Sequence, residues 1–286
     1  MGDEDVNSAG VDLPYFSYAA PEDPSLKRFC IQAIETLTGQ RRLKQLYLEY
    51  RRTAASGSGA DEDFWQAAIE KLELDLAYDL QAFQRIPSDG PLVVVCNHPF
   101  GVLDGIVICY LMSRARPNFK VLTNSVLYRA PEIRPYVLPI DFAETREALA
   151  INLATRRAAM EELRADGAVV VFPAGGVATT PGLFAPIAVD DEWKSFVGKL
   201  IKQSKSTVVP IFFEGQNSRL FQIVSQFSLM LRVSLLFKEV ADRIGTRMDI
   251  RIGEAIDFSD LAHLTDRQAL MDHLREITMA LRRGDG

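Results

Sequence analysis

Cysteine and histidine are both scarce in this chain, which contains three of each among its 286 residues. Cys30, Cys96 and Cys109 have neither the spacing of a disulfide framework nor that of a metal site, so we expect no bound metal. Cys96 and Cys109 lie in apolar runs, where we expect them to act as small core residues. This cysteine usage is consistent with a reducing cytoplasm.

The chain also lacks an excess of basic residues and any long apolar segment. Its 32 lysines and arginines are outnumbered by 38 acidic residues, and the net charge of −6 argues against nucleic acid as a partner. The acidic N-terminus has no apolar segment of the kind found in signal peptides, so none is expected. No stretch is apolar and long enough to cross a bilayer. If the substrate is a lipid, we expect the protein to sit on a membrane rather than in it.

The remaining composition, 48% hydrophobic and 24% charged, is typical of a globular protein. Short apolar runs alternate with helical patterns, which predicts an α/β fold with a mostly parallel central sheet flanked by helices. Pro210 lies within one of these runs and predicts an edge or bulged strand there. The expected strands are 93–96, 119–123, 136–140, 168–172, 207–213 and 248–252, and the expected helices include 105–112, 145–166, 192–205 and 266–282.

Three parts of the chain are expected. Residues 1–24 carry three prolines and predict an irregular arm, residues 25–86 predict a helical hairpin, and residues 87–286 predict the α/β domain. The second helix of the hairpin is expected over residues 64–83. The first helix has a basic face with two open interpretations: a solvated face, or attraction to anionic lipid headgroups at roughly 1 kcal/mol per basic residue. The residues of this basic face are Arg41, Arg42, Lys44, Arg51 and Arg52.

The chemistry of the chain centres on residues 93–105. A buried strand ends in Asn97-His98-Pro99, and Asp104 precedes an apolar helical run as its expected N-cap. Both side chains are therefore expected at one rim of the sheet, where open α/β sheets bind ligands. A carboxylate bonded to one imidazole nitrogen leaves the other nitrogen free to take a proton from a hydroxyl or amine of the substrate. The alternative is an ordinary loop histidine beside a helix cap.

The segment Asn97-His98-Pro99-Phe100-Gly101-Val102-Leu103-Asp104-Gly105 resembles the His-Asp box of the lysophospholipid and glycerolipid acyltransferases. Its five intervening residues, where the family usually has four, are similar to the hemolysin-like and ornithine-lipid acyltransferase branch. The resemblance extends over residues 91–256. It implies that His98 and Asp104 are catalytic and that Asn97, Phe100 and Gly101 contribute to substrate binding.

The third box of the family resembles Phe172-Pro173-Ala174-Gly175-Gly176, all five of which are substrate-binding candidates. Ala174 stands where the family usually has glutamate, and Gly176 and Val177 replace the usual polar and basic residues. The glycine N–H groups are expected to receive an anionic oxygen. The lost side chains count against glycerol 3-phosphate and favour an acceptor that is held by its lipid chain.

Two further boxes are less distinct. Residues 136–141 resemble the second box, for which Arg146 is the substrate-binding candidate and an exposed helix residue is the alternative. Residues 207–219 resemble the fourth box, in which Asn217 and Ser218 either support the substrate or form a simple turn and N-cap. The apolar segment 220–237 that follows is expected to be a core helix, with an acyl-chain groove or an interfacial face as the alternative.

The resemblance implies an acyltransferase of lipid metabolism, in phospholipid biosynthesis or a related route, bound peripherally at the cytoplasmic face of a membrane. His98 would deprotonate the hydroxyl of a lysolipid-type acceptor, which attacks an acyl thioester of coenzyme A or of acyl carrier protein. Apart from this co-substrate, no cofactor or metal is implied. Two rival functions stay open: a hydrolase that uses the same pair to activate water, and a non-catalytic lipid-binding protein.

Overall fold

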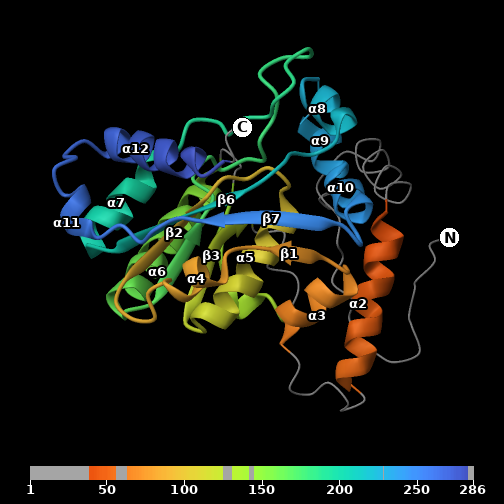
Figure 1. Ribbon diagram of the computed structural model, residues 1–286, viewed down its shortest axis with the longest axis horizontal. Helices are drawn as coiled ribbons and strands as arrows, with labels where there is room; N and C mark the ends of the chain where they lie inside the picture. Colours follow the sequence, from red (N-terminus) through yellow and green to blue (C-terminus); the bar gives the residue numbers. More distant parts are fainter. Residues whose placement is uncertain (1–38, 56–62, 125–130, 142–144, 228, 283–286) are drawn as a thin grey trace.

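The computed structural model of the chain (Figure 1) describes residues 39–55, 63–124, 131–141, 145–227 and 229–282. Within them a seven-stranded sheet has the strand order β1-β7-β6-β2-β5-β3-β4. Every neighbouring pair is parallel except β6 and β7. The predicted α/β fold with a mostly parallel sheet is therefore confirmed. The strands are β1 (Asp75–Ala77), β2 (Leu92–Cys96), β3 (Phe119–Asn124), β4 (Val137–Ile140), β5 (Ala168–Val171), β6 (Thr207–Phe213) and β7 (Arg247–Ile252).

Helices cover both faces of this sheet (Figure 1). Helices α3 and α5 contribute to the core on one face, and α6, α7 and α12 contribute to the core on the other. The helices are α2 (Gln40–Ala55), α3 (Phe64–Lys71), α4 (Leu80–Gln84), α5 (Val102–Ala115), the 3-10 turn η2 (Arg134–Tyr136), α6 (Arg146–Arg164), α7 (Ser195–Ser204), α8 (Arg219–Ser225), α9 (Leu229–Ser234), α10 (Leu236–Asp242), α11 (Phe258–Leu261) and α12 (Arg267–Ala280).

Strand β2 is the centre of both cores. Val94 packs into one core and its neighbours Val93 and Val95 into the other, because successive side chains of a strand point to opposite faces. All five residues of β2 are completely buried. A strand that is covered on both faces needs apolar residues at every position, which explains its continuous apolar run.

Two predicted helices are wrong. The helix expected over residues 64–83 is instead α3, the short edge strand β1 and α4, and β1 pairs in parallel with β7. Residues 75–77 thus belong to the sheet, ahead of the domain boundary predicted at residue 86. The segment 220–237 is not one helix but the three short helices α8, α9 and α10. The predicted arm 1–24 and the beginning of the hairpin lie outside the described residues.

Pro210 lies in an internal strand, since β6 is flanked by β2 and β7, so the edge alternative is wrong. There is a bulge beside Pro210, but its extra residue lies in the segment after β7 rather than in β6. Residue 208 bridges residue 256 and residue 211 pairs with residue 252, so two residues of β6 face three residues beyond β7. This irregularity accommodates a residue that has no N–H to donate.

Three parallel strands at the middle of the sheet, β6, β2 and β5, end at the same rim. The segments that follow them are 214–218, 97–101 and 172–178. The chain leaves β2 towards β3, on one side of it, whereas it leaves β6 towards β7, on the opposite side. The rim between β2 and β6 is therefore a topological switch point. The fold therefore brings together the segments that resemble the first, third and fourth boxes.

Candidate active site

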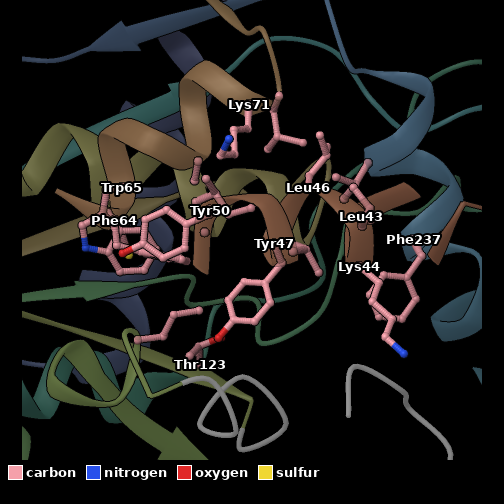
Figure 2. Close-up of a pocket in the computed structure, with 18 of the residues that line it drawn as sticks. Leu43, Lys44, Leu46, Tyr47, Tyr50, Phe64, Trp65, Lys71, Thr123 and Phe237 are labelled. Carbon is pink, nitrogen blue, oxygen red and sulfur yellow. The ribbon is translucent and has the colours of Figure 1, made fainter. Parts of the chain in front are cut away.

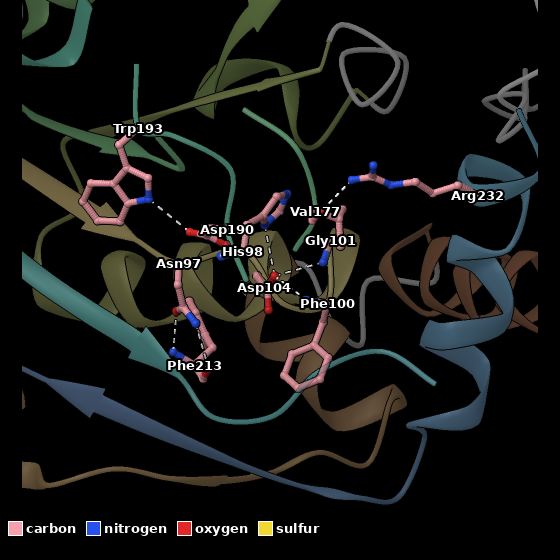
Figure 3. A network of polar contacts seen from close by, with 10 residues as sticks. All are labelled: Asn97, His98, Phe100, Gly101, Asp104, Val177, Asp190, Trp193, Phe213 and Arg232. Carbon is pink, nitrogen blue, oxygen red and sulfur yellow. Dashed lines mark hydrogen bonds and ion pairs between the residues drawn. The ribbon is translucent and has the colours of Figure 1, made fainter. Parts of the chain in front are cut away.

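His98 and Asp104 are in direct contact at this rim (Figure 3). The His98 Nδ1 atom lies 3.0 Å from Asp104 Oδ2. Because an ionised carboxylate only accepts hydrogen bonds, Nδ1 carries the proton and Nε2 keeps a lone pair. Figure 3 shows the second ring nitrogen directed away from the carboxylate, and 17% of the His98 side chain is exposed. The pair thus has the geometry of a general base with an orienting acid.

The prediction that Asp104 is the N-cap of α5 is wrong. Gly101 is at the cap, and Asp104 is the third residue of the helix. The Oδ2 atom accepts two further hydrogen bonds, from the N–H groups of Phe100 (2.8 Å) and Gly101 (2.9 Å). The side chain is completely buried. The carboxylate therefore receives three N–H donors at a helix N-terminus, where a negative charge is stabilised.

The conformation of Gly101 explains why the bend between His98 and Asp104 contains glycine. Its φ of +80° is strained for residues with a side chain. An added Cβ would lie 3.0 Å from side-chain atoms of both Val177 and Leu236. Gly101 thus lets the chain turn sharply while the loop after β5 packs against it. Its predicted role in substrate binding stays a prediction.

His98 is also supported from its other side. The ring lies 4.1 Å from the Phe172 ring, centroid to centroid, with an angle of 32° between the planes. The His98 N–H donates to Asp190 Oδ1 at 3.1 Å, and the His98 carbonyl accepts from the N–H of Ala178 at 2.8 Å. Asp190 in turn accepts from the Trp193 indole N–H at 3.1 Å. These contacts hold the imidazole between the ends of β2 and β5.

No sequence motif identifies the role of Asp190 beside His98. Burial raises the pKa of its carboxyl, while the hydrogen bonds from Trp193 and from the His98 backbone oppose that rise. Asp190 is hydrogen-bonded to the His98 backbone and not to the ring, with which it interacts only through its charge. We therefore regard it as a positioning residue.

The two glycines of the third box have different roles. The Gly175 N–H closes a turn to the Phe172 carbonyl at 3.0 Å, with φ at +75°, so it is already used. The Gly176 N–H has no acceptor among the described residues. Pro173 and Ala174 are both buried, Ala174 within the core beneath the loop. Of this box, Phe172 contacts the His98 ring, and Gly176 has an N–H group without an acceptor among the described residues.

Arg232 reaches the same loop from α9 (Figure 3). Its Nη2 donates to the Val177 carbonyl, and an added Cβ on Gly176 would lie 3.5 Å from that nitrogen. Burial lowers the pKa of the guanidinium, and the charge of Asp191 opposes this. Val177 stands where the family box usually has a basic residue. Arg232 thus places a guanidinium beside this position from another part of the chain. The only signal for it in the sequence was a lone arginine in an apolar segment.

Asn97 and Phe100 have structural contacts. The Asn97 amide donates to the Phe213 carbonyl at 3.0 Å and accepts from the Phe213 N–H at 2.7 Å, which joins the ends of β2 and β6. The Phe100 ring is buried beneath Gly215 and lies 3.8 Å from the Arg243 guanidinium. Burial lowers the pKa of Arg243, and the nearby charge of Asp104 opposes this, so Arg243 is a cation close to the buried carboxylate.

The remaining candidates divide into three cases. Ser218 caps α8 through the Phe221 N–H, and its hydroxyl donates to Glu239, which supports the N-cap interpretation. Asn217 is 1% exposed, and both polar atoms of its amide lack a partner among the described residues, so a ligand could use them. Arg146 is exposed at the start of α6, beyond β4, which is three strand spacings or roughly 14 Å from β2.

A separate apolar cavity opens between α2, α3, α5 and α10 (Figure 2). Its volume is about 180 Å³. One face of α5 contributes Val102, Gly105, Ile106 and Cys109 to its wall, so the cavity reaches the helical turn that contains Asp104. Lys44 and Lys71 lie among otherwise mostly apolar and aromatic lining residues, as expected of a site for a hydrocarbon chain beside a polar group.

The basic face of α2 is only partly solvated. Arg41, Arg42, Lys44 and Arg52 are exposed, whereas Arg51 pairs with Glu132. The same carboxylate accepts from the Tyr47 hydroxyl at 2.9 Å. Attraction of this face to anionic lipids stays a prediction.

The described part of the chain contains neither a metal-binding cluster nor a membrane-spanning helix. No cluster of His, Cys, Asp and Glu there could hold a metal ion. Among those residues, no helix combines the length and the apolar character that crossing a bilayer requires.

Comparisons with known proteins show which family this chain resembles. Two similar curated relatives are each named lyso-glycine lipid O-acyltransferase. The one from Phocaeicola vulgatus is 28% identical over 189 residues, which are 61% of this chain and 61% of the relative. The one from Bacteroides thetaiotaomicron is 30% identical over 169 residues, 56% of this chain and 55% of the relative. The chain thus matches less than two thirds of the length of these relatives.

The solved structure of PlsC, the 1-acyl-sn-glycerophosphate acyltransferase of Thermotoga maritima, aligns over 91% of this chain and 83% of its own length. Its sequence identity is 14% and the TM-score is 0.47. A family model described as Acyltransferase matches residues 61–284 and so covers the sheet, the His-Asp pair and the glycine loop. Because this match spans most of the chain, the chain belongs to this acyltransferase family.

Proposed function

We propose that the protein transfers a fatty acyl group from a thioester to the hydroxyl of a lysolipid, with His98 as the general base. The observation that carries this proposal is the 3.0 Å contact between His98 Nδ1 and the buried Asp104 carboxylate in a chain of the acyltransferase family. The names of the two curated relatives support a lyso-glycine lipid as the acceptor and oxygen as the acylated atom.

The reaction is a single acyl transfer. The acceptor O–H gives its proton to His98 Nε2 as its oxygen attacks the thioester carbonyl. The tetrahedral intermediate collapses with expulsion of the thiolate, which takes the proton back from the imidazolium. Asp104 stabilises that imidazolium through Nδ1–H. The N–H of Gly176 is the candidate donor to the oxyanion, since it has no acceptor among the described residues.

The apolar cavity is proposed as the site of the acyl chain. Its walls are largely hydrocarbon and aromatic, and they extend to the first turn of α5. Burial of methylene groups there would contribute about 0.8 kcal/mol each. The cavity borders the side of α5 that is opposite to Asp104. The acyl chain would therefore enter the cavity from the rim, across Gly101 and Val102.

Arg232 is proposed to hold the anionic part of the acceptor. The family's third box usually supplies a basic residue for this purpose, and Val177 stands at that position here. The contact of Arg232 with the Val177 carbonyl places a guanidinium beside the loop by another route. The Val177–Ala178 peptide joins that guanidinium to His98, because its carbonyl faces Arg232 and its N–H faces the His98 carbonyl. A carboxylate held there would keep the acceptor near Nε2.

The donor and the location belong to the same proposal. Either acyl-coenzyme A or acyl carrier protein would supply the thioester, and a lipid acceptor requires contact with a membrane surface, where the protein would bind peripherally. The hemolysin-like and ornithine-lipid branch stays a prediction from the spacing of the His-Asp box.

The test is to supply purified protein with lyso-glycine lipid and each thioester in turn, and to measure free thiol and lipid product together. The proposal expects one O-acylated lipid for each thiol released. Thiol release without lipid product would identify the rival hydrolase. Lipid binding without any thiol release would identify the non-catalytic lipid-binding protein.

A further inference from the structure

Two segments that begin at the rim of the sheet that holds His98 carry most of the exposed large apolar side chains among the described residues. The first is the loop 179–189, and the second is α8 with the residues just after it. Phe184 is 94% exposed and Phe227 is 71% exposed. We call the whole set the apolar face, and its members are Leu183, Phe184, Ile187, Val189, Leu220, Ile223 and Phe227.

The two segments form one surface, because side chains of α8 and of the turn before it bind the backbone of the loop. Arg219 donates to the carbonyls of Leu183 and Ala185. Gln216 accepts from the Ala188 N–H at 2.7 Å and donates to the Pro186 carbonyl at 3.0 Å. Figure 1 shows the loop that precedes α7 projecting beside α8 at the top of the molecule.

The base of the loop is fixed in the same way. The Thr180 N–H donates to Gln222 at 2.9 Å, and its carbonyl accepts from Gln226 at 2.6 Å. Thr179 and Val189 exchange two backbone hydrogen bonds, at 3.2 and 3.0 Å. Much of the polar backbone of the loop is therefore satisfied internally while its apolar side chains point outward.

These features together suit a lipid surface. Backbone groups that enter the hydrocarbon region without a partner cost several kcal/mol each, so a loop that inserts must satisfy them internally. On α8, Leu220 and Ile223 lie on one exposed stripe that Phe227 continues, whereas Phe221 is buried on the opposite side. An apolar stripe that faces outward is what an interfacial helix presents.

The charges of the two segments agree with this interpretation. Residues 177–189 contain no charged residue, and residues 215–237 contain two arginines and no acidic residue. This distribution differs from that of the whole chain, in which acidic residues outnumber basic ones. Anionic headgroups would therefore meet no opposing charge from these segments.

We propose that the apolar face inserts into the surface of a lipid bilayer and thereby sets the rim that holds His98 against the membrane. This inference rests on the proposed function, because only a lipid acceptor needs to reach His98 from a bilayer. The loop continues directly from Ala178, which bonds to His98, and α8 continues from Asn217 at the same rim. Insertion of both segments would let an acceptor move to Nε2 without crossing water.

The first test uses a gain of signal. Phe184→Trp places a fluorophore at the most exposed apolar position, and vesicles with brominated acyl chains should quench it. Leu149→Trp, on α6, is the matched control, because Leu149 is 60% exposed outside the apolar face and should not be quenched. Equal quenching of both variants, or quenching of neither, would overturn the proposal.

The second test uses a loss of binding. The double variant F184S/F227S should lower the partition coefficient onto phosphatidylglycerol vesicles by roughly tenfold or more, since two phenyl rings no longer leave water. The control L149S/L153S should bind like the wild type. Binding through the apolar face should persist at 0.5 M NaCl, whereas attraction through the basic face of α2 would be screened. Wild-type binding of vesicles by F184S/F227S would overturn the proposal. The proposal would also be overturned if the double variant lost self-association instead of vesicle binding.

Activity separates this inference from the proposed function. With lysolipid and thioester dispersed in detergent, F184S/F227S should keep wild-type turnover, because the change lies outside the catalytic pair. If the wild type transfers no acyl group in detergent, the proposed function fails, and the vesicle results stand on their own. If the double variant loses activity in detergent as well, the apolar face acts on catalysis, and the proposed membrane role is wrong.

Discussion

Replacement of Asp104 by asparagine changes one atom at the centre of the site. Asp104 Oδ2 accepts from His98 and from the N–H groups of Phe100 and Gly101, and Oδ1 is buried without a partner among the described residues. If the asparagine oxygen takes the place of Oδ2, its NH₂ group occupies the buried Oδ1 position. If the amide is reversed, a donor faces three donors. Neither orientation satisfies every group.

The magnitude follows from these contacts. A buried unsatisfied donor costs about 1–3 kcal/mol, which a protein with roughly 5–15 kcal/mol of stability survives. The effect on the reaction is larger, because the imidazolium loses the negative charge that stabilises it and its tautomer is no longer fixed. The analogous change in a Ser-His-Asp triad lowers kcat about 10⁴-fold. We expect Asp104→Asn to lower kcat/KM by about 10³- to 10⁴-fold, which corresponds to about 4–5 kcal/mol.

The assay compares kcat/KM for acyl transfer with the urea midpoint of unfolding. Asp190→Asn is the matched control, because Asp190 bonds to the backbone of His98 and to Trp193 but not to the imidazole. Asp190→Asn should lose a similar amount of stability but should lose far less activity than Asp104→Asn. The reasoning is refuted if folded Asp104→Asn keeps kcat/KM within tenfold of the wild type, or if the two variants lose activity equally.

Two further predictions concern the substrates. Gly105→Leu fills the apolar cavity, and an added Cβ meets no atom within 4 Å, so thioesters of shorter chains should be preferred while helix stability rises by up to about 0.8 kcal/mol. Unchanged chain-length preference in competition assays would contradict the acyl site. Arg232→Gln should raise the KM for an anionic lysolipid about tenfold or more with little change in kcat, and Arg232→Lys should restore part of it. An equal effect on an uncharged acceptor would contradict the anionic contact.

The sequence predicts the centre of the fold well, because strands β2, β5 and β6 are covered on both faces and therefore read as continuous apolar runs. The sequence does not predict the strand β1 at the edge of the sheet. Leu76 continues the helical spacing of α3, yet residues 75–77 pair with β7, a contact between positions far apart in the sequence. Local patterns carry no information about such pairing, and tertiary contacts override them.

The site shows the same division. His98 and Asp104 lie six residues apart, so a motif can relate them. Arg232, Arg243 and Asp190 reach the site only through the packing of α9, α10 and the segment before α7, and no local motif relates them to His98. Asn97 was expected at the substrate, but its amide joins the ends of β2 and β6, a role that depends on strand order.

The central claim is that the imidazole of His98 removes the proton from the acceptor. The most direct measurement is the initial rate of O-acylated lipid formation by His98→Ala, with circular dichroism and a melting curve to show that it is folded. We expect a loss of at least about 100-fold and up to about 10,000-fold. A folded His98→Ala protein that forms the lipid product at a near wild-type rate would contradict the account.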